Sequence, residues 1–148
     1  MGTTEFAPGQ SGYRRAKVAD AMRHGVIGCP PGAPLRAVAR IMATNHVHCV
    51  VITGYQVDRS GHSGEHAWGV VSDMDLTRSA GAVDDLMAGE VATTDVPTVH
   101  PDTPLADAAR MMAELGAGHL VVVTPLTGRP VGVISTLDVA GNLAWARG

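Results

Sequence analysis

A short phrase of seven residues occurs twice in the chain. The first phrase is Gly-Val-Val-Ser-Asp-Met-Asp at 69–75, and the second phrase is Gly-Val-Ile-Ser-Thr-Leu-Asp at 132–138. The residues before each phrase repeat as well, because 33–52 and 103–123 both contain a Pro-Leu pair, apolar residues at helical spacing and a run rich in valine. The chain is therefore predicted to contain two copies of one structural unit.

Each copy contains one long amphipathic helix. The apolar positions recur at the i, i+3, i+4, i+7 spacing that places them on one helical face. They are Leu35, Val38, Ala39 and Met42 in the first copy, and Leu105, Ala108, Ala109 and Met112 in the second. Pro34 and Pro104 suit the first helical position, and Asn45 and Gly116 or Gly118 are expected to end the helices.

Further strands and helices follow from residue type and spacing. Valine-rich runs on both sides of a polar or Gly-rich connection predict a β-hairpin in each copy. The first connection, 54–67, is longer and reads as a polar loop insertion. The predicted elements are hairpin strands at 48–52, 68–72, 119–124 and 131–135, helices at 73–80 and 136–146, short lead-in helices at 18–22 and 83–87, and lead-in strands at 26–29 and 96–100.

These elements define an α+β fold in which each copy has the order strand, helix, strand, strand, helix. One such copy is too small to bury a core well, so two copies are expected to share one. At 45% hydrophobic and 17% charged, the chain has enough apolar residues for that core. The predicted domains are a polar N-terminal arm at 1–17, repeat 1 at 18–82 and repeat 2 at 83–146.

Composition excludes several partners. The formal net charge is −3 and no basic stripe is present, which argues against binding to nucleic acid. No apolar run approaches the ~20 residues of a membrane span. The first 17 residues lack the apolar core of a signal peptide, and Cys29 and Cys49 lie in apolar surroundings as expected of reduced thiols. A cytoplasmic protein that acts on neither nucleic acid nor membrane is expected.

The Ser-x-x-Asp part of each phrase has two interpretations. Directly before a helix it is close to a capping box, in which Ser72 or Ser135 caps the helix and Asp75 or Asp138 reaches back to the serine N–H. An ionised carboxylate can also accept hydrogen bonds from the two hydroxyls of a ribose, and free N–H groups at a helix start can bind phosphate. Both roles can hold for the same residues.

The element order, the Pro-Leu helix starts and the G-V-[VI]-S-x-x-D phrases resemble the CBS domain, and two in tandem resemble a Bateman module. The resemblance covers roughly 18–146. It implies two CBS repeats packed through their sheets in a pseudo-two-fold module, without catalytic activity. It also implies a regulatory adenosine-containing ligand, AMP, ADP, ATP or S-adenosylmethionine, bound in clefts between the repeats. Population shift toward the ligand-bound arrangement would pass the signal to an unknown effector protein.

The resemblance also implies which residues form each cleft, with the aspartates on the ribose, the lead-in segments around adenine and the histidines toward phosphate. Site 1 is expected to contain Ser72, Asp75, Thr94, Val96, Pro97 and His119. Site 2 is expected to contain Ser135, Asp138, Gly25, Val26, Ile27 and His48.

Some residues depart from the family pattern. Asp73 lies beside the first expected site and would repel phosphate. Arg78 and Arg129 are the nearest arginines to the phrases, so a monophosphate or S-adenosylmethionine is favoured over a triphosphate. Gly28 stands where repeat 2 has Thr98, which would make the second site looser.

Two other interpretations of the chain differ in class. One is a structural dimerisation module without a physiological ligand. It shares with the regulatory module an expected homodimer through the helices at 73–80 and 136–146, where Leu143 and Trp145 would otherwise be exposed. The other is an enzyme. His62-Ser-Gly-Glu-His66 has the letters of a zinc protease motif, but that motif requires a helix, and this segment lies in the insertion. No metal site and no catalytic residue is predicted.

Overall fold

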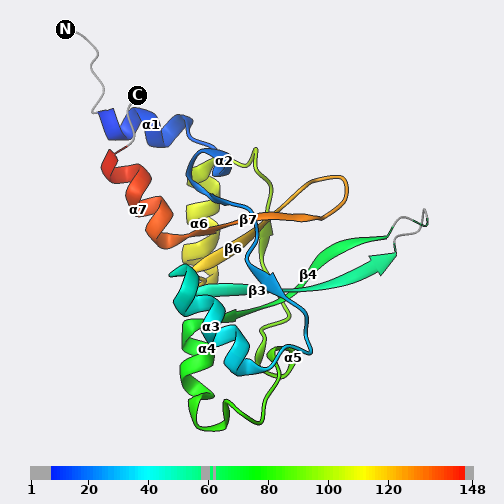
Figure 1. Cartoon of the computed structure of the whole chain (residues 1–148). Coiled ribbons are helices and arrows are strands. Elements are labelled where there is room, and N and C mark those ends of the chain that lie inside the picture. The colour runs from blue at the N-terminus through cyan, green and yellow to red at the C-terminus, as the bar shows by residue number, and fades with distance from the viewer. Residues whose placement is uncertain (1–7, 58–60, 62, 146–148) are drawn as a thin grey trace, which may run out of the picture. The chain divides into compact units, whose positions relative to one another are not determined.

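The computed structural model describes residues 8–57, 61 and 63–145. They form two compact units, each assembled from separate stretches of the chain (Figure 1). Unit 1 contains 8–25, 97–126 and 131–145, and unit 2 contains the described residues of 26–96 together with 127–130. Helices and strands occur in both units, as an α+β fold requires.

Unit 2 has a three-stranded sheet of order β2-β3-β4. β2 is parallel to β3, and β3 and β4 form an antiparallel hairpin. The elements are β2 (Gly28–Cys29), α3 (Leu35–Asn45), β3 (Cys49–Val57), β4 (Ser63–Ser72), α4 (Asp73–Arg78), the 3₁₀ turn η1 (Ala80–Ala82) and α5 (Ala88–Val91).

Unit 1 has a four-stranded sheet of order β1-β7-β6-β5. β1 pairs antiparallel with β7, and β5 pairs parallel with β6. The elements are α1 (Pro8–Arg15), α2 (Val18–Ala21), β1 (Arg23–His24), β5 (Thr98–Val99), α6 (Leu105–Leu115), β6 (His119–Val123), β7 (Pro130–Ser135) and α7 (Thr136–Trp145). The predicted long helices and hairpins are therefore confirmed, with the boundary changes described below.

The cores follow the predicted helical faces. In unit 2, Leu35 and Val38 are fully buried against sheet residues such as Ile52. In unit 1, Leu105 and Ala108 are fully buried and share a cluster with Leu120, Val122 and Ile134. Burial of branched side chains at 3.6-residue spacing provides most of the stability of such helices.

The lead-in helices pack on the core of the other repeat. Val18 of α2 is fully buried in the unit 1 cluster, and its N–H donates to the Thr103 carbonyl at 2.8 Å. Ala88 of α5 is fully buried in the unit 2 cluster, and its N–H donates to the Ala33 carbonyl at 2.8 Å. Each core is therefore completed by the lead-in helix of the opposite repeat.

The position of the second lead-in helix corrects the sequence prediction. Residues 83–85 form turns, Met87 forms an isolated β-bridge with Pro34, and the helix is α5, which begins at Ala88. Glu90 explains the start, because its carboxylate accepts a hydrogen bond from the Met87 N–H at 2.9 Å. Asp20 makes the matching 2.8 Å bond to the Lys17 N–H at the start of α2. The lead-in strands are also shorter than predicted, being only the two-residue β2 and β5.

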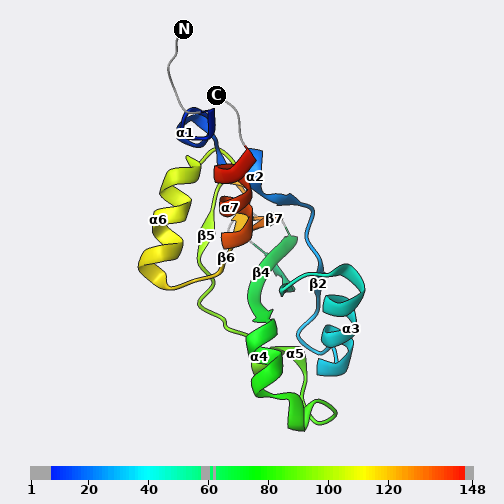
Figure 2. The ribbon, with the colours of Figure 1, turned by 90° about the vertical axis from the view of Figure 1, so that its left-hand side faces the viewer.

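Helix α1 lies inside 1–17, the segment that the sequence predicts to be a polar N-terminal arm. It contacts α6 and α7 (Figure 2), and Tyr13 packs partly buried against the unit 1 core. The aromatic ring of Tyr13 provides the apolar contact between this short helix and the core. The mostly polar composition of 1–17 gives no indication of that contact.

The ends of the long helices differ slightly from prediction. Pro34 and Pro104 occupy the N-cap position rather than the first helical position. Gly116 ends α6 in the left-handed conformation at φ 64°, as predicted. In α3 the residue that ends the helix in the left-handed conformation is His46 at φ 55°, one residue beyond the predicted Asn45. A non-glycine residue in this conformation is uncommon.

The insertion at 54–67 is largely a β-ribbon, not a loop. Pairing continues from Thr53 opposite Ala67 to Val57 opposite Ser63, after an irregularity between Ile52 and Thr53. Tyr55 and Val57 in this segment favour extended backbone. Residues 58–60 and 62 of the insertion lie outside the described residues.

Candidate functional site

The glycine that begins each phrase allows a second strand segment to approach closely. A Cβ atom on Gly69 would lie 2.8 Å from the Thr93 carbonyl oxygen, and one on Gly132 would meet the Arg23 carbonyl oxygen. Both neighbours belong to segments that follow a lead-in helix. Val70 and Thr93 exchange two backbone hydrogen bonds of 2.9 Å, and Arg23 pairs with Val133. Glycine is required where backbones come this close.

Both phrases form complete capping boxes. The Ser72 N–H donates to Asp75 Oδ2 at 3.0 Å, and the Asp75 N–H donates to Ser72 Oγ at 3.1 Å. The Ser135 N–H donates to Asp138 Oδ2 at 2.9 Å, and the Asp138 N–H donates to Ser135 Oγ at 3.2 Å. The capping interpretation is therefore confirmed at both positions.

These boxes leave part of each carboxylate available. Ser135 Oγ also donates to Asp138 Oδ2 at 3.0 Å. Across the described residues, no hydrogen bond reaches Oδ1 of Asp138 or of Asp75, although Asp75 Oδ1 lies 3.7 Å from Arg78 Nη1. The Asp75 side chain is 19% exposed. Each aspartate can therefore cap its helix through one oxygen and accept a ligand hydroxyl through the other.

The helix N-termini have fewer available N–H groups for a phosphate than the sequence predicts. The Asp73 N–H donates to the His48 carbonyl at 2.9 Å, and the Asp75 N–H is used by the capping box. In the second phrase, the Thr136 N–H donates to the Gly118 carbonyl at 3.0 Å, and the Asp138 N–H is again used by the box. Two of the first three N–H groups are thus already bonded, so the helix starts alone cannot bind an anion well.

A contact between the first phrase and His48 has no equivalent residue pair in the second phrase. His48 Nδ1 lies 2.7 Å from Asp73 Oδ2, and both side chains are more than half exposed. Position 73 corresponds to Thr136 in the second phrase, so only the first carries an extra carboxylate.

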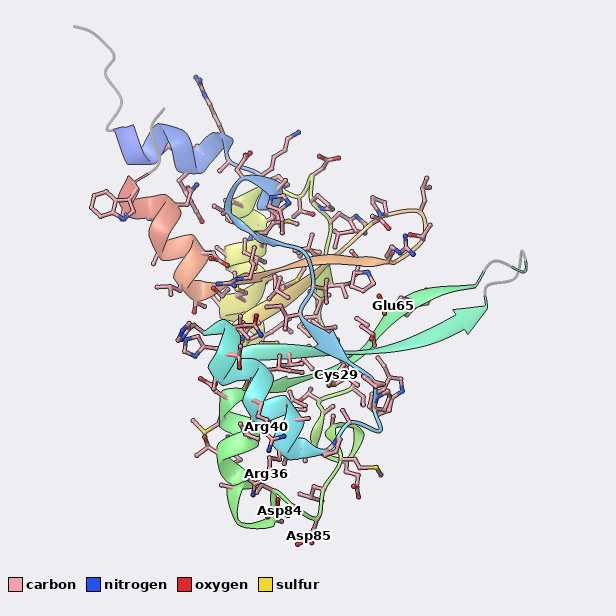
Figure 3. All side chains as sticks on the ribbon, viewed as in Figure 1. Cys29, Arg36, Arg40, Glu65, Asp84 and Asp85 are labelled. Atoms are coloured by element: carbon pink, nitrogen blue, oxygen red, sulfur yellow. The ribbon has the colours of Figure 1, made fainter. Side chains whose placement is uncertain are left out.

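The carboxylates of the first phrase influence a buried thiol. The pKa of Cys49 is raised to about 12, mainly because burial disfavours the thiolate and also because Asp75 and Asp73 are negatively charged. Burial also raises the pKa of Cys29, which is labelled in Figure 3. Both cysteines are free thiols, as predicted, and neither is suited to act as a nucleophile.

The predicted site residues divide between the two units. Of site 1, unit 2 holds Ser72, Asp75, Thr94 and Val96, and unit 1 holds Pro97 and His119. Of site 2, unit 1 holds Ser135, Asp138 and Gly25, and unit 2 holds Val26, Ile27 and His48.

Within each unit, several of these residues lie along the strands of the hairpins. Thr94 follows the Thr93–Val70 bridge, and the Gly25 N–H donates to the Val131 carbonyl at 2.9 Å. Ile27 accepts from the Val51 N–H at 3.1 Å, and Pro97 accepts from the Val121 N–H at 3.2 Å. The lead-in backbones therefore border both hairpins, while the membership of the two sites remains a prediction.

Unit 1 also contains a shallow apolar pocket of about 370 Å³ between α6 and α7. Small residues at the end of α6 leave this space open. The lining is Ala109, Met112, Ala113, Gly116, Ala117, Gly118, Thr136 and Val139.

The structure offers no support for the zinc protease motif. Glu65 and His66 lie on strand β4, whereas the motif requires a helix, and His62 lies outside the described residues. No group of three or more His, Cys, Asp or Glu residues in the described part of the chain could hold a metal ion. Within the same residues, no helix is long and apolar enough to cross a membrane.

Comparison with known proteins identifies the family. The CBS domain family model matches residues 18–81 and 88–144, so the chain belongs to the CBS domain family and contains two tandem CBS domains. The resemblance inferred from the repeated phrases is confirmed. No match was found among curated proteins.

Solved structures of CBS proteins share this fold. A CBS domain protein from Pyrobaculum aerophilum complexed with AMP is 27% identical, with a TM-score of 0.70 over 87% of this chain and 98% of that one. The CBS domain pair of protein MJ0100, in complex with 5′-methylthioadenosine and S-adenosyl-L-methionine, is 21% identical, with a TM-score of 0.73 over 87% and 96% of the two chains. A hexameric CBS-CP12 protein from bloom-forming cyanobacteria is 15% identical, with a TM-score of 0.69 over 84% and 66%.

Proposed function

We propose that the chain is a non-catalytic regulatory module that binds an adenosine-containing ligand, such as AMP, ADP, ATP or S-adenosylmethionine, in the clefts expected between its two CBS repeats. The observation that carries the proposal is the geometry of Asp75 and Asp138. Each is partly buried, held by a capping box through Oδ2, and able to accept ribose hydroxyls through Oδ1.

Two similar proteins support the ligand class. The Pyrobaculum aerophilum protein was solved with AMP, and the MJ0100 domain pair with 5′-methylthioadenosine and S-adenosyl-L-methionine. These ligands share an adenine and a ribose and differ in what the ribose 5′ position carries. Ligand binding would favour one arrangement of the repeats and alter the surface that an effector protein contacts.

A ligand of this class is expected to raise the melting temperature. At a free concentration of 100 times Kd, binding stabilises the native state by about 2.7 kcal/mol, or roughly 5–10 °C for a chain of this length. A thermal melting screen of the four ligands at millimolar concentration tests this, with guanosine monophosphate as the matched control. Unchanged melting temperatures with all four would support the alternative function, a structural dimerisation module.

The exposed side chains of α7 support a homodimer under either function. Leu137, Leu143 and Trp145 are 72%, 51% and 82% exposed. Large apolar side chains gathered on one helix beside the apolar pocket are typical of a protein–protein contact. A second copy of the chain would bury them in a closed two-fold contact.

Light scattering at micromolar concentration is therefore expected to give twice the 15.3 kDa mass of the chain. Trp145→Glu should shift the protein toward monomer, because it places a charge in the contact. Leu126→Glu is the matched control, since Leu126 is 98% exposed in the β6–β7 turn and lies on no helix. A monomer at every concentration would contradict the dimer.

A further inference from the structure

Trp68 directly precedes the first phrase and interrupts the pairing of β3 with β4. Ile52 pairs with Gly69, and the next residue, Thr53, pairs with Ala67. The ladder therefore skips Trp68, which has no residue opposite it. An extra residue of this kind is a β-bulge, which bends the strand and redirects side chains, and bulges are over-represented next to active sites. The bulge thus sets the direction of a large aromatic side chain at the start of the phrase.

The hydrophobic cores do not explain this tryptophan. Trp68 is 40% exposed. Among the described residues, it is in neither core cluster and is not one of the partly buried side chains packed against them. The matching residue of the second repeat, Val131, does pack partly buried against the unit 1 core. Core packing therefore accounts for the residue before the second phrase but not for the residue before the first.

The segment expected around the adenine lies against the same part of β4. A Cβ on Gly69 would lie 3.1 Å from Ala92 Cβ, and Val70 and Thr93 exchange two backbone hydrogen bonds of 2.9 Å. The bridge is antiparallel, so the chain beyond Thr93 leaves it in the direction of the β4 residues that precede Val70. Trp68 is one of those residues, and all of these positions belong to unit 2.

Asp75 lies beyond the opposite end of the same strand segment. Four residues of extended strand separate Trp68 from Ser72, the partner of Asp75 in the capping box, which is a separation of about 13 Å. A nucleoside and two side chains occupy a span of this length. A ligand whose ribose is held at Asp75 Oδ1 can therefore extend its base along β4 toward the indole.

We propose that Trp68 stacks on the base of a ligand whose ribose is bound by Asp75. The inference rests on the proposed function and adds a specificity-determining residue to its first site. Stacking of a base on an aromatic side chain is favourable because both present flat π-faces. The second phrase follows Val131 and has no such surface, so the first phrase depends more strongly on the base of its ligand.

Tryptophan fluorescence tests the contact directly. The chain has two tryptophans, so Trp145→Phe leaves Trp68 as the only one. Asp138→Asn is added to weaken binding at the second phrase. In this double variant, saturating AMP should change the Trp68 emission, because the base covers the indole. Ribose 5-phosphate has the same sugar and phosphate without a base and should leave the emission unchanged. Emission that stays unchanged at saturating AMP would overturn the inference.

Calorimetric titration in the Asp138→Asn background gives the affinities. Trp68→Val copies the residue of the second repeat and should weaken AMP binding about tenfold, with the Kd of ribose 5-phosphate unchanged. Trp68→Phe keeps an aromatic face and should recover most of the AMP affinity. Because Trp68 is in neither core, both variants should melt close to the unmodified protein. Leu126→Ala is the control, since Leu126 is 98% exposed and should have no effect on AMP binding.

The outcomes separate this inference from the proposed function. Unchanged AMP affinity in Trp68→Val, or an equal loss of affinity for AMP and ribose 5-phosphate, would assign Trp68 a structural role and overturn the inference alone. Failure of the unmodified protein to bind AMP or S-adenosylmethionine would overturn the proposed function and the inference with it.

Discussion

Replacing Gly132 with alanine is expected to lower the free energy of unfolding by about 3 kcal/mol. The new Cβ would overlap the Arg23 carbonyl oxygen and lie 2.6 Å from Met22 Cε. The carbonyl belongs to β1, whose backbone is paired with β7, so it cannot move without breaking that pairing. Urea unfolding followed by circular dichroism measures the loss.

Gly141→Ala is the matched control for this prediction. Gly141 lies inside α7, and an added Cβ would meet no atom within 4 Å. Alanine there should stabilise the helix by roughly 0.5–1 kcal/mol. Gly69→Ala should resemble Gly132→Ala, because its Cβ would lie 2.8 Å from the Thr93 carbonyl oxygen. Equal unfolding free energies for Gly132→Ala and Gly141→Ala would contradict the close backbone approach.

The second large effect concerns the two capping aspartates. Asp75→Asn and Asp138→Asn should each weaken ligand binding at their own phrase by about 1.5–3 kcal/mol, because a charged acceptor for the ribose hydroxyls is lost. An asparagine oxygen can still accept from the serine N–H, so the helix cap should largely persist. The melting temperature without ligand should therefore change little.

Asp107→Asn serves as the control for these variants. Asp107 is an exposed carboxylate in the first turn of α6, where it pairs with Arg110. Removing its charge should leave ligand affinity unchanged. If all three variants bind as the unmodified protein does, Asp75 and Asp138 act only as helix caps.

Local sequence patterns were sufficient to predict the long helices, the hairpins and the capping boxes. The α3 and α6 faces follow from apolar spacing, and each Ser-x-x-Asp contains both partners of its own box within four residues. These features depend on residues close together in the chain, which is why periodicity and spacing predict them.

The start of α5 and the pairing of distant segments were not predicted, because apolar spacing does not determine them. The start of α5 is set by Glu90, although Val83 and Met87 reproduce the apolar spacing of Val18 and Met22 and suggested an earlier helix. The exchange of lead-in helices between cores, and the close approach of Thr93 and Arg23 to the phrase glycines, join residues far apart in the chain. Local spacing contains no signal for such pairings.

Surface contacts between polar side chains were likewise not predicted from the sequence. Arg36 Nε lies 2.7 Å from Asp84 Oδ1 (Figure 3), and the pairing lowers the pKa of Asp84. His48 and Asp73 are 25 residues apart in sequence and meet because Cys49 and Ser72 are paired across β3 and β4. The presence of Asp73 in the first phrase is evident from the sequence, but its contact with His48 is not.

The most direct measurement is a calorimetric titration of AMP and of S-adenosylmethionine into the unmodified protein and into the double variant Asp75→Asn/Asp138→Asn. The account predicts saturable binding of at least one ligand to the unmodified protein and at least a tenfold weaker Kd in the double variant, with the fold preserved by circular dichroism. Binding of equal affinity in both proteins, or no binding to the unmodified protein, would contradict an adenosine-ligand module that uses these two aspartates.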